Sequence, residues 1–236
     1  MSNPESHTFA YLGPVGTFTE AALKKITCDT DKKIPYANVT AALDAVRKGD
    51  ADYALVPIEN SVEGVVARTL DELASGDQLT ICAEVTLPVT FAFMTKPGAT
   101  AIKRIGTHPH AESQCREYIA KNYPHAEVVP TASTSAAAEA VSRGELDAAI
   151  ASSTAAEHFG LEIRAEDIGD NSGAVTRFIC AQKPGWIPDP TGDDRTSMAV
   201  FIDIDHAGAL LEILQVFAKN DVNLTFIQSR PTGREL

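Results

Sequence analysis

The sequence has 236 residues, of which 44% are hydrophobic and 22% are charged, and its formal net charge is -12. This composition is typical of a globular chain of one or two domains. The acidic excess argues against nucleic acid and anionic membrane surfaces as partners, because both attract clustered Lys and Arg. No apolar run has the length of a membrane helix and the N-terminus lacks a signal-peptide pattern, so we expect a cytoplasmic protein.

The cysteines stand far apart in the chain and form no C-x-x-C pair. We therefore expect them to be reduced residues that pack in the interior, and we expect no metal site. They are Cys28, Cys82, Cys115 and Cys180.

Short apolar runs alternate with helical stretches that glycines end, which is the pattern of βα units. In the first part of the chain we expect strand 8–12, a turn that opens into a helix capped by Thr17 or Thr19, helix 40–48 capped by Thr40 and ended by Gly49, strand 53–57 and helix 62–73. Two extended runs follow, residues 79–87 and 90–94, and Pro88 separates them. A chain that crosses between two lobes would fit this break.

The same alternation continues in the second part. We expect strand 102–106, helix 111–122, strand 127–129, helix 134–143, strand 147–151 and strand 175–182. Residues 184–194 hold three prolines and two glycines without periodicity and indicate a linker.

Beyond the linker, the pattern predicts strand 196–204, helix 208–219 and strand 222–228, which form one βαβ unit. A ribbon this small leaves a sheet face and an edge uncovered, so we expect an incomplete domain. The predicted division is a catalytic domain over 8–183, with one lobe at about 8–86 and 167–183 and the other at about 87–166, then the linker, then residues 195–236.

Two polar segments follow predicted strands in the first part of the chain. Residues 13–20 (GPVGTFTE) could offer free backbone N–H groups to an anion, although a plain turn explains the spacing equally well. Residues 57–64 (PIENSVEG) gather polar side chains at the carboxyl end of a strand, where α/β proteins bind ligands. Ser61 could instead simply cap a helix.

Three further polar segments lie in the second part. His108 and His110, with Gln114 nearby, could suggest a metal, but no third ligand follows at a fixed spacing. Residues 133–135 (STS) could cap a helix, bind an anion, or both. Arg177, inside a strand pattern, needs an anionic ligand or a structural salt bridge.

In this order the five segments resemble the prephenate dehydratases over almost the whole chain. The family motifs G-P-x-G-T-(F/Y)-(S/T), P-I-E-N-S-x-x-G, S-H-P-x-A-x-x-Q, S-T-(A/S)-x-A and T-R-F each have a counterpart here. The resemblance implies an α/β fold, with a two-lobed catalytic domain resembling type 2 periplasmic binding proteins. A partial ferredoxin-like ACT unit, a regulatory module, would follow.

The resemblance also implies which residues act. The catalytic set would be Thr176, Arg177, Asn60, Gln114 and Glu59, and the substrate-binding set Thr17, Ser61, Thr107, His108, Ser133, Thr134 and Phe178. The effector set would be Gly208, Ala209, Leu210 and Leu211 together with Gln228, Ser229, Arg230 and Pro231. The chain departs from the family pattern at Thr107 (serine), Ala207 (proline) and Gln228 (glutamate).

The implied reaction is the decarboxylating dehydration of prephenate to phenylpyruvate, CO2 and water in L-phenylalanine biosynthesis, with phenylalanine as feedback effector. Because formation of the aromatic ring drives both losses, we expect no cofactor. Thr176 would donate the proton to the leaving hydroxyl, and Arg177 and the helix starts after Gly16, Ser61 and Ser133 would supply positive potential. We expect a dimer or tetramer when the ACT domain is complete. Arogenate as substrate, or a non-catalytic sensor module, are the alternatives.

Overall fold

The computed structural model describes residues 6–171, 173–202, 204 and 206–231. The chain divides into two compact units, Met1–Pro188 and Asp189–Leu236. Within the described residues, no helix combines the length and the apolar character needed to cross a membrane.

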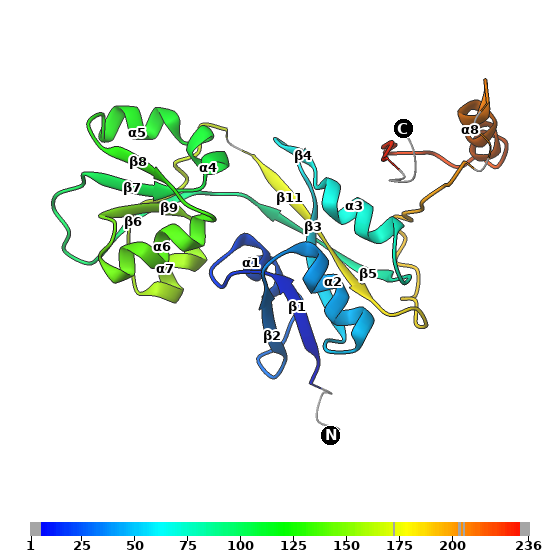
Figure 1. Cartoon of the computed structure of the whole chain (residues 1–236), viewed down its shortest axis with the longest axis horizontal. Helices are drawn as coiled ribbons and strands as arrows, with labels where there is room; N and C mark the ends of the chain where they lie inside the picture. Colours follow the sequence, from blue (N-terminus) through cyan, green and yellow to red (C-terminus); the bar gives the residue numbers. More distant parts are fainter. Residues whose placement is uncertain (1–5, 172, 203, 205, 232–236) are drawn as a thin grey trace. The chain divides into compact units, whose positions relative to one another are not determined.

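One sheet of the first unit has the strand order β2-β1-β3-β11-β5, with the short β4 paired to β3 (Figure 1). Its strands are β1 (Thr8–Leu12), β2 (Lys32–Tyr36), β3 (Tyr53–Asn60), β4 (Gly64–Val65), β5 (Thr80–Pro88) and β11 (Val175–Gln182). β1 runs parallel to β2 and β3, whereas β11 runs antiparallel to β3 and β5. The helices of this lobe are α1 (Phe18–Leu23), α2 (Val39–Lys48) and α3 (Ala67–Ala74).

A second sheet has the order β10-β6-β9-β7-β8. Its strands are β6 (Ala92–Thr95), β7 (Arg104–Thr107), β8 (Glu127–Pro130), β9 (Ala148–Ala151) and β10 (Glu162–Ala165), and its helices are α4 (Pro109–Ser113), α5 (Arg116–Asn122), α6 (Thr134–Arg143) and α7 (Ser153–Phe159). The chain passes between the sheets twice, and the two passages meet where Val89 N–H donates to the Ala174 carbonyl at 2.7 Å. The predicted two-lobed α/β class is confirmed.

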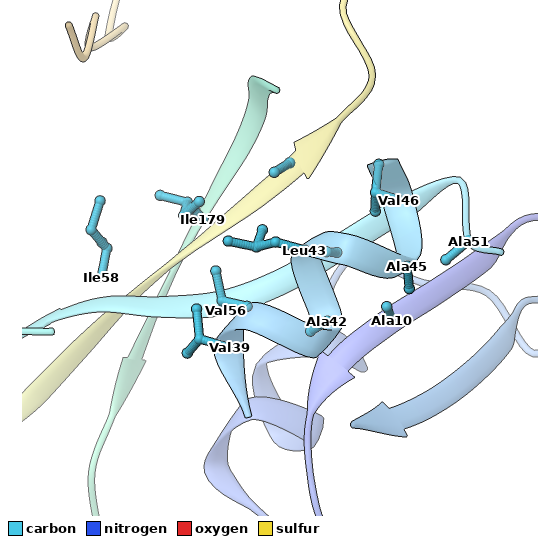
Figure 2. Close-up of a cluster of buried hydrophobic side chains, with 12 residues drawn as sticks. Ala10, Val39, Ala42, Leu43, Ala45, Val46, Ala51, Val56, Ile58 and Ile179 are labelled. Atoms are coloured by element: carbon cyan, nitrogen blue, oxygen red, sulfur yellow. The ribbon is translucent and has the colours of Figure 1, made fainter. Parts of the chain in front are cut away.

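Helix α2 shows how the pattern of the sequence builds the first lobe. Its apolar side chains, including Leu43 and Val46, pack on Val56 of β3 and Ile179 of β11 (Figure 2). The helix ends at Gly49, as predicted, in the left-handed conformation with φ of 85°. Its cap is Asn38 and not the predicted Thr40, because the Asn38 side chain accepts the Ala41 N–H at 2.8 Å.

Several predicted elements have other bounds. The helix expected over 62–73 begins only at Ala67, because the chain first turns back at Asn60 and pairs as β4. The helix expected over 111–122 is two helices that break at Gln114 and Cys115. The pattern also gave no sign of β2, α7 or β10.

The second unit contains α8 (Ala209–Lys219), which matches the predicted helix. The strands expected over 196–204 and 222–228 were wrong, since the described residues of these ranges form no strand. A strand needs a hydrogen-bonded neighbour, and none of the described residues of this unit pairs with either run. Alternation alone therefore did not suffice for a strand here.

Candidate functional site

Thr176 and Asn60 lie opposite each other on the antiparallel strands β11 and β3. The Asn60 Nδ2 donates to Thr176 Oγ1 at 2.8 Å. Asn60 Oδ1 accepts the backbone N–H groups of Val62 at 2.8 Å and Glu63 at 3.0 Å, which fixes the orientation of the amide. Thr176 is only 9% exposed, and because its oxygen accepts from Asn60, its own proton is left to be donated. The structure thus joins two of the residues predicted to be catalytic.

Arg177, the next residue along β11, points to the opposite face of the sheet, as strand geometry requires. Its guanidinium pairs with Glu59 Oε2 at 3.0 Å and with Glu84 Oε2 at 3.0 Å. Burial lowers its pKa, but the hydrogen bonds to Glu84 and Glu59 outweigh this effect and raise the pKa overall. The salt bridge that the sequence left open is therefore present, and it occupies both Arg177 and Glu59.

Ser61 fastens the end of β3 to the start of β11. Its Oγ accepts the Val175 N–H at 2.9 Å, and its own N–H donates to the Val175 carbonyl at 2.9 Å. The predicted helix start after Ser61 was wrong, because α3 begins at Ala67. Ser61 consequently holds the two strands together beside Thr176 and provides no helix dipole.

Gln114 lies at the end of α4 in the second lobe and is 8% exposed. Its Nε2 donates to Glu63 Oε1 at 3.3 Å, so a residue of the Asn60 turn contacts it directly. The other oxygen of Glu63 accepts from His110 Nδ1 at 2.5 Å. Glu63 and His110 were absent from the predicted site, because only the tertiary structure brings the two segments together.

His108 and Thr107 precede α4. His108 caps this helix, and its Nδ1 accepts the His110 N–H at 3.3 Å. Burial and then the charge of His110 lower the pKa of His108, against an opposing effect of Glu63. A neutral ring that accepts at Nδ1 carries its proton on Nε2. Thr107 is fully buried and donates to the Ile150 carbonyl at 2.9 Å, so this hydroxyl supports the fold. Its contact with substrate stays a prediction.

The N-terminus of α6 lies against the loop before α1. Ser133 caps α6 by accepting the Ala136 N–H at 3.0 Å, and Thr134 is the first residue of the helix. The Ser135 hydroxyl donates to the Val15 carbonyl, and Ser152 Oγ donates to the Gly16 carbonyl at 2.8 Å. These contacts join the two lobes.

The start of α1 is less suited to an anion than the sequence suggested. Thr17 caps the helix, as expected, but the carboxylate of Glu20 accepts the Gly16 N–H at 2.5 Å. The anionic ligand of this turn is therefore a side chain of the protein itself. Phe178 is 1% exposed and packs in the core with Tyr11 and Leu55, and its contact with substrate stays a prediction.

The predicted effector residues belong to the second unit. Gly208 precedes α8 with φ of 99°, Ala209 is buried, and Leu210 and Leu211 are exposed. The segment 228–231 has no regular structure, and its Gln228 side chain donates to the Ser229 carbonyl at 3.1 Å.

Two surface hollows, of about 660 and 480 Å³, lie beside α2 and α5. Neither of them is lined by Thr176, Asn60 or Gln114. Within the described ranges, no cluster of three or more His, Cys, Asp or Glu side chains could hold a metal ion. The hydrogen-bonded group around Thr176 is thus the arrangement of side chains best suited to catalysis.

Comparison with known proteins identifies the family of the chain. Residues 9–185 match the family described as prephenate dehydratase. A prephenate dehydratase of Amycolatopsis methanolica is 44% identical over 94% of this chain and 73% of its own length. The chain belongs to the prephenate dehydratase family. It is accordingly an enzyme of the hydro-lyase class, whose reaction is the decarboxylating dehydration of prephenate to phenylpyruvate.

Solved structures of related proteins extend this result. A prephenate dehydratase of Arthrobacter aurescens in complex with L-Phe superposes with a TM-score of 0.89, at 48% identity, over 97% of this chain and 77% of its own. GqqA, described as a novel type of quorum quenching acylase, has a TM-score of 0.79 at 27% identity over 97% of this chain and 83% of its own. Proteins of this shape thus include more than one described activity.

Proposed function

We propose that Thr176 donates a proton to the departing hydroxyl of prephenate and that Asn60 makes this donation possible. The 2.8 Å hydrogen bond from Asn60 Nδ2 to Thr176 Oγ1 carries the proposal. A threonine hydroxyl is a weak acid, but a hydrogen bond that its oxygen accepts favours the negative charge that forms as the proton leaves. The fixed amide of Asn60 therefore polarises the hydroxyl in the direction that the reaction requires.

The reaction breaks two bonds of the substrate and transfers one proton to the leaving hydroxyl. As the ring carboxylate leaves as CO2, the electrons of its carbon–carbon bond move into the ring. The bond between the ring carbon and the hydroxyl breaks at the other end of the ring, and the oxygen takes the proton from Thr176 and leaves as water. The threonine oxygen recovers a proton from solvent after the product has left. Orientation of the substrate and proton transfer are thus the tasks of the site.

Binding of the dianionic substrate needs local positive potential in a chain of net charge -12. Arg177 is a poor source, because two carboxylates neutralise it. We assign the larger part to the start of α6, a ten-residue helix whose first turn holds no acidic residue. Ser133, Thr134 and the Nε2–H of neutral His108 would add hydrogen bonds, and Gln114 would orient the ring hydroxyl or a carboxylate.

The test is to measure turnover of prephenate and of arogenate by the wild-type chain and by Thr176→Ala. We expect phenylpyruvate from prephenate, and a loss of kcat of roughly 10²-fold or more in Thr176→Ala with KM nearly unchanged. Asn60→Asp should also lose kcat, because a carboxylate cannot donate to Thr176. Its Oδ1 would still accept the two backbone N–H groups, so the fold should persist.

Two other results would redirect the assignment. Equal losses in kcat and in substrate affinity for Thr176→Ala would contradict its role as proton donor. Formation of phenylalanine from arogenate at a higher kcat/KM than phenylpyruvate from prephenate would change the substrate but not the chemistry of the site.

We further propose phenylalanine as an effector that binds the predicted ACT region, residues 195–236, through the segments 208–211 and 228–231. The related Arthrobacter aurescens structure is a complex with L-Phe, and this supports the proposal. We also propose that the chain oligomerises through the same region. Residues 8–183 would form the catalytic domain, and a linker over 184–194 would follow. The protein would act in amino acid biosynthesis in the cytoplasm.

A further inference from the structure

The carboxylate of Glu63 joins the two lobes beside the reacting residues. Its Oε2 lies 2.5 Å from His110 Nδ1, and its Oε1 accepts from Gln114 Nε2 at 3.3 Å. The backbone N–H of the same residue donates to Asn60 Oδ1 at 3.0 Å. Glu63 therefore continues the hydrogen-bonded series from Thr176 through Asn60 across to α4.

The two contacts of Glu63 have different effects. A carboxylate can only accept hydrogen bonds, so His110 must carry a proton on Nδ1, and this bond holds α4 against the turn that follows β3. The bond from Gln114 fixes the orientation of the carboxamide, because the Nε2 end faces Glu63. Rotation of the amide by half a turn would place its oxygen against the carboxylate of Glu63, and the repulsion between the oxygens disfavours this orientation.

A carboxylate near a site for a dianion opposes binding unless its charge is met by donors. Glu63 meets this condition in the structure, because each of its oxygens has a donor. Its side chain is 37% exposed, and it therefore lies at the edge of the site. This position suits a residue that arranges other groups and does not itself contact the reacting atoms.

We propose that Glu63 is a positioning residue of the dehydratase: it sets the orientation of the Gln114 amide and, through His110, holds α4 against the Asn60 turn. The inference rests on the proposed function, because it gives Gln114 a part in orienting the substrate. It adds a residue at one of the x positions of the P-I-E-N-S-x-x-G motif.

A double-mutant cycle tests the proposal. Glu63→Ala should lower kcat roughly 10-fold with KM changed by less than about 2-fold, because a charge-assisted hydrogen bond orients a group needed in the transition state. Gln114→Ala should lower kcat roughly 10²-fold, and the double variant should lose no more than Gln114→Ala alone. Additive losses, roughly 10³-fold in the double variant, would overturn the proposal.

Two further variants complete the design. Glu63→Gln keeps the shape of the side chain but only one accepting oxygen, so it should recover only part of the lost kcat, whereas a purely steric role would restore it fully. Glu112→Ala is the matched control, because it removes a carboxylate from the same helix as His110, and we expect wild-type kcat. A loss in Glu112→Ala equal to that in Glu63→Ala would also overturn the proposal.

Hydrogen exchange separates this inference from the proposed function. Glu63→Ala should speed amide exchange in both segments 61–66 and 109–114, whereas Glu112→Ala should leave segment 61–66 unchanged. If the wild-type chain converts neither prephenate nor arogenate, the proposed function fails, and exchange still decides on the contact between the lobes. Unchanged exchange in both segments of Glu63→Ala would contradict the inference.

Discussion

The protonation state of His108 follows from where its ring lies. Burial and the charge of His110 lower its pKa below the ordinary value of 6.5. As pH falls through 6.5, the unfolded chain takes up the proton before the folded chain does. The free energy of unfolding should therefore be highest above this pH and decrease as pH drops towards the lowered pKa of the folded state.

The variant that checks this is His108→Asn, since asparagine is a good helix cap and does not titrate. Urea unfolding at about pH 5.5 and about pH 7.5 should show a smaller difference in the variant than in the wild type. His125→Asn, at an exposed position, is the control and should keep the wild-type difference. A wild-type pH dependence in His108→Asn would show that His108 does not cause it.

How far single residues could be predicted depended on whether their partners were local. Thr176, Asn60 and Gln114 were chosen from motifs, and the structure connects all three. The partners of Arg177 depend on the register of β11 against β3 and β5, which no local pattern specifies. Burial of Thr107 and Phe178 likewise depends on packing across the sheet, and the contact between Glu63 and His110 needs both lobes.

The loop between β1 and α1 is crowded at Gly16, which has φ of 79°. A Cβ at this position would lie 2.9 Å from Ser135 Oγ and 3.1 Å from Ala155 Cα. Gly16→Ala should therefore add a clash with the second lobe to the strain of a left-handed backbone. We expect it to lower the free energy of unfolding by about 2 to 4 kcal/mol.

Gly98→Ala separates these two effects, because Gly98 has φ of 76° and nothing within 4 Å of the added Cβ. It should cost only about 1 to 2 kcal/mol. Denaturant unfolding of both variants measures the difference, which reports the crowding between the lobes. Equal losses would mean that the loop moves away from Ser135 and Ala155 at little cost.

Helices and strands were predicted correctly where the sequence marks both their ends and the face that is buried. Strands β1 and β11 and helix α6 have the predicted bounds, since their hydrophobic pattern and flanking turn residues agree. β2, with the sequence KKIPY, begins with two lysines, contains a proline and lies at the sheet edge, so its pattern gave no signal. The two strands expected beyond residue 195 had a pattern but no described neighbour to pair with.

At the scale of the molecule, the four clusters of buried apolar side chains found among the described residues all belong to the first unit. In the second unit, most large apolar side chains of α8 and its flanking segments are exposed, among them Leu210, Leu211 and Phe226. We therefore expect a chain that ends at Pro188 to fold and to keep kcat within about 2-fold of the full chain.

The same truncated chain tests the effector. L-Phe should change kcat/KM or the melting temperature of the full chain, and should change neither in the chain that ends at Pro188. L-Ala, which lacks the aromatic ring, is the control ligand. A truncated chain that still responds to L-Phe would place the effector site in the first unit, and loss of folding in that chain would contradict its independence.

The order of the two residues in the Thr176-Arg177 pair matters as much as their identity. Since neighbours on a strand face opposite sides, exchanging them would place a guanidinium beside Asn60 and leave Glu59 and Glu84 facing a hydroxyl that cannot neutralise them. A shift of β11 by one residue would likewise turn Arg177 away from the face of Glu59 and Glu84. The ion pairs of Arg177 thus stabilise the register of β11 in which the Thr176 hydroxyl faces Asn60. Contacts on one face of the sheet therefore determine which side chain lies at the site on the other face.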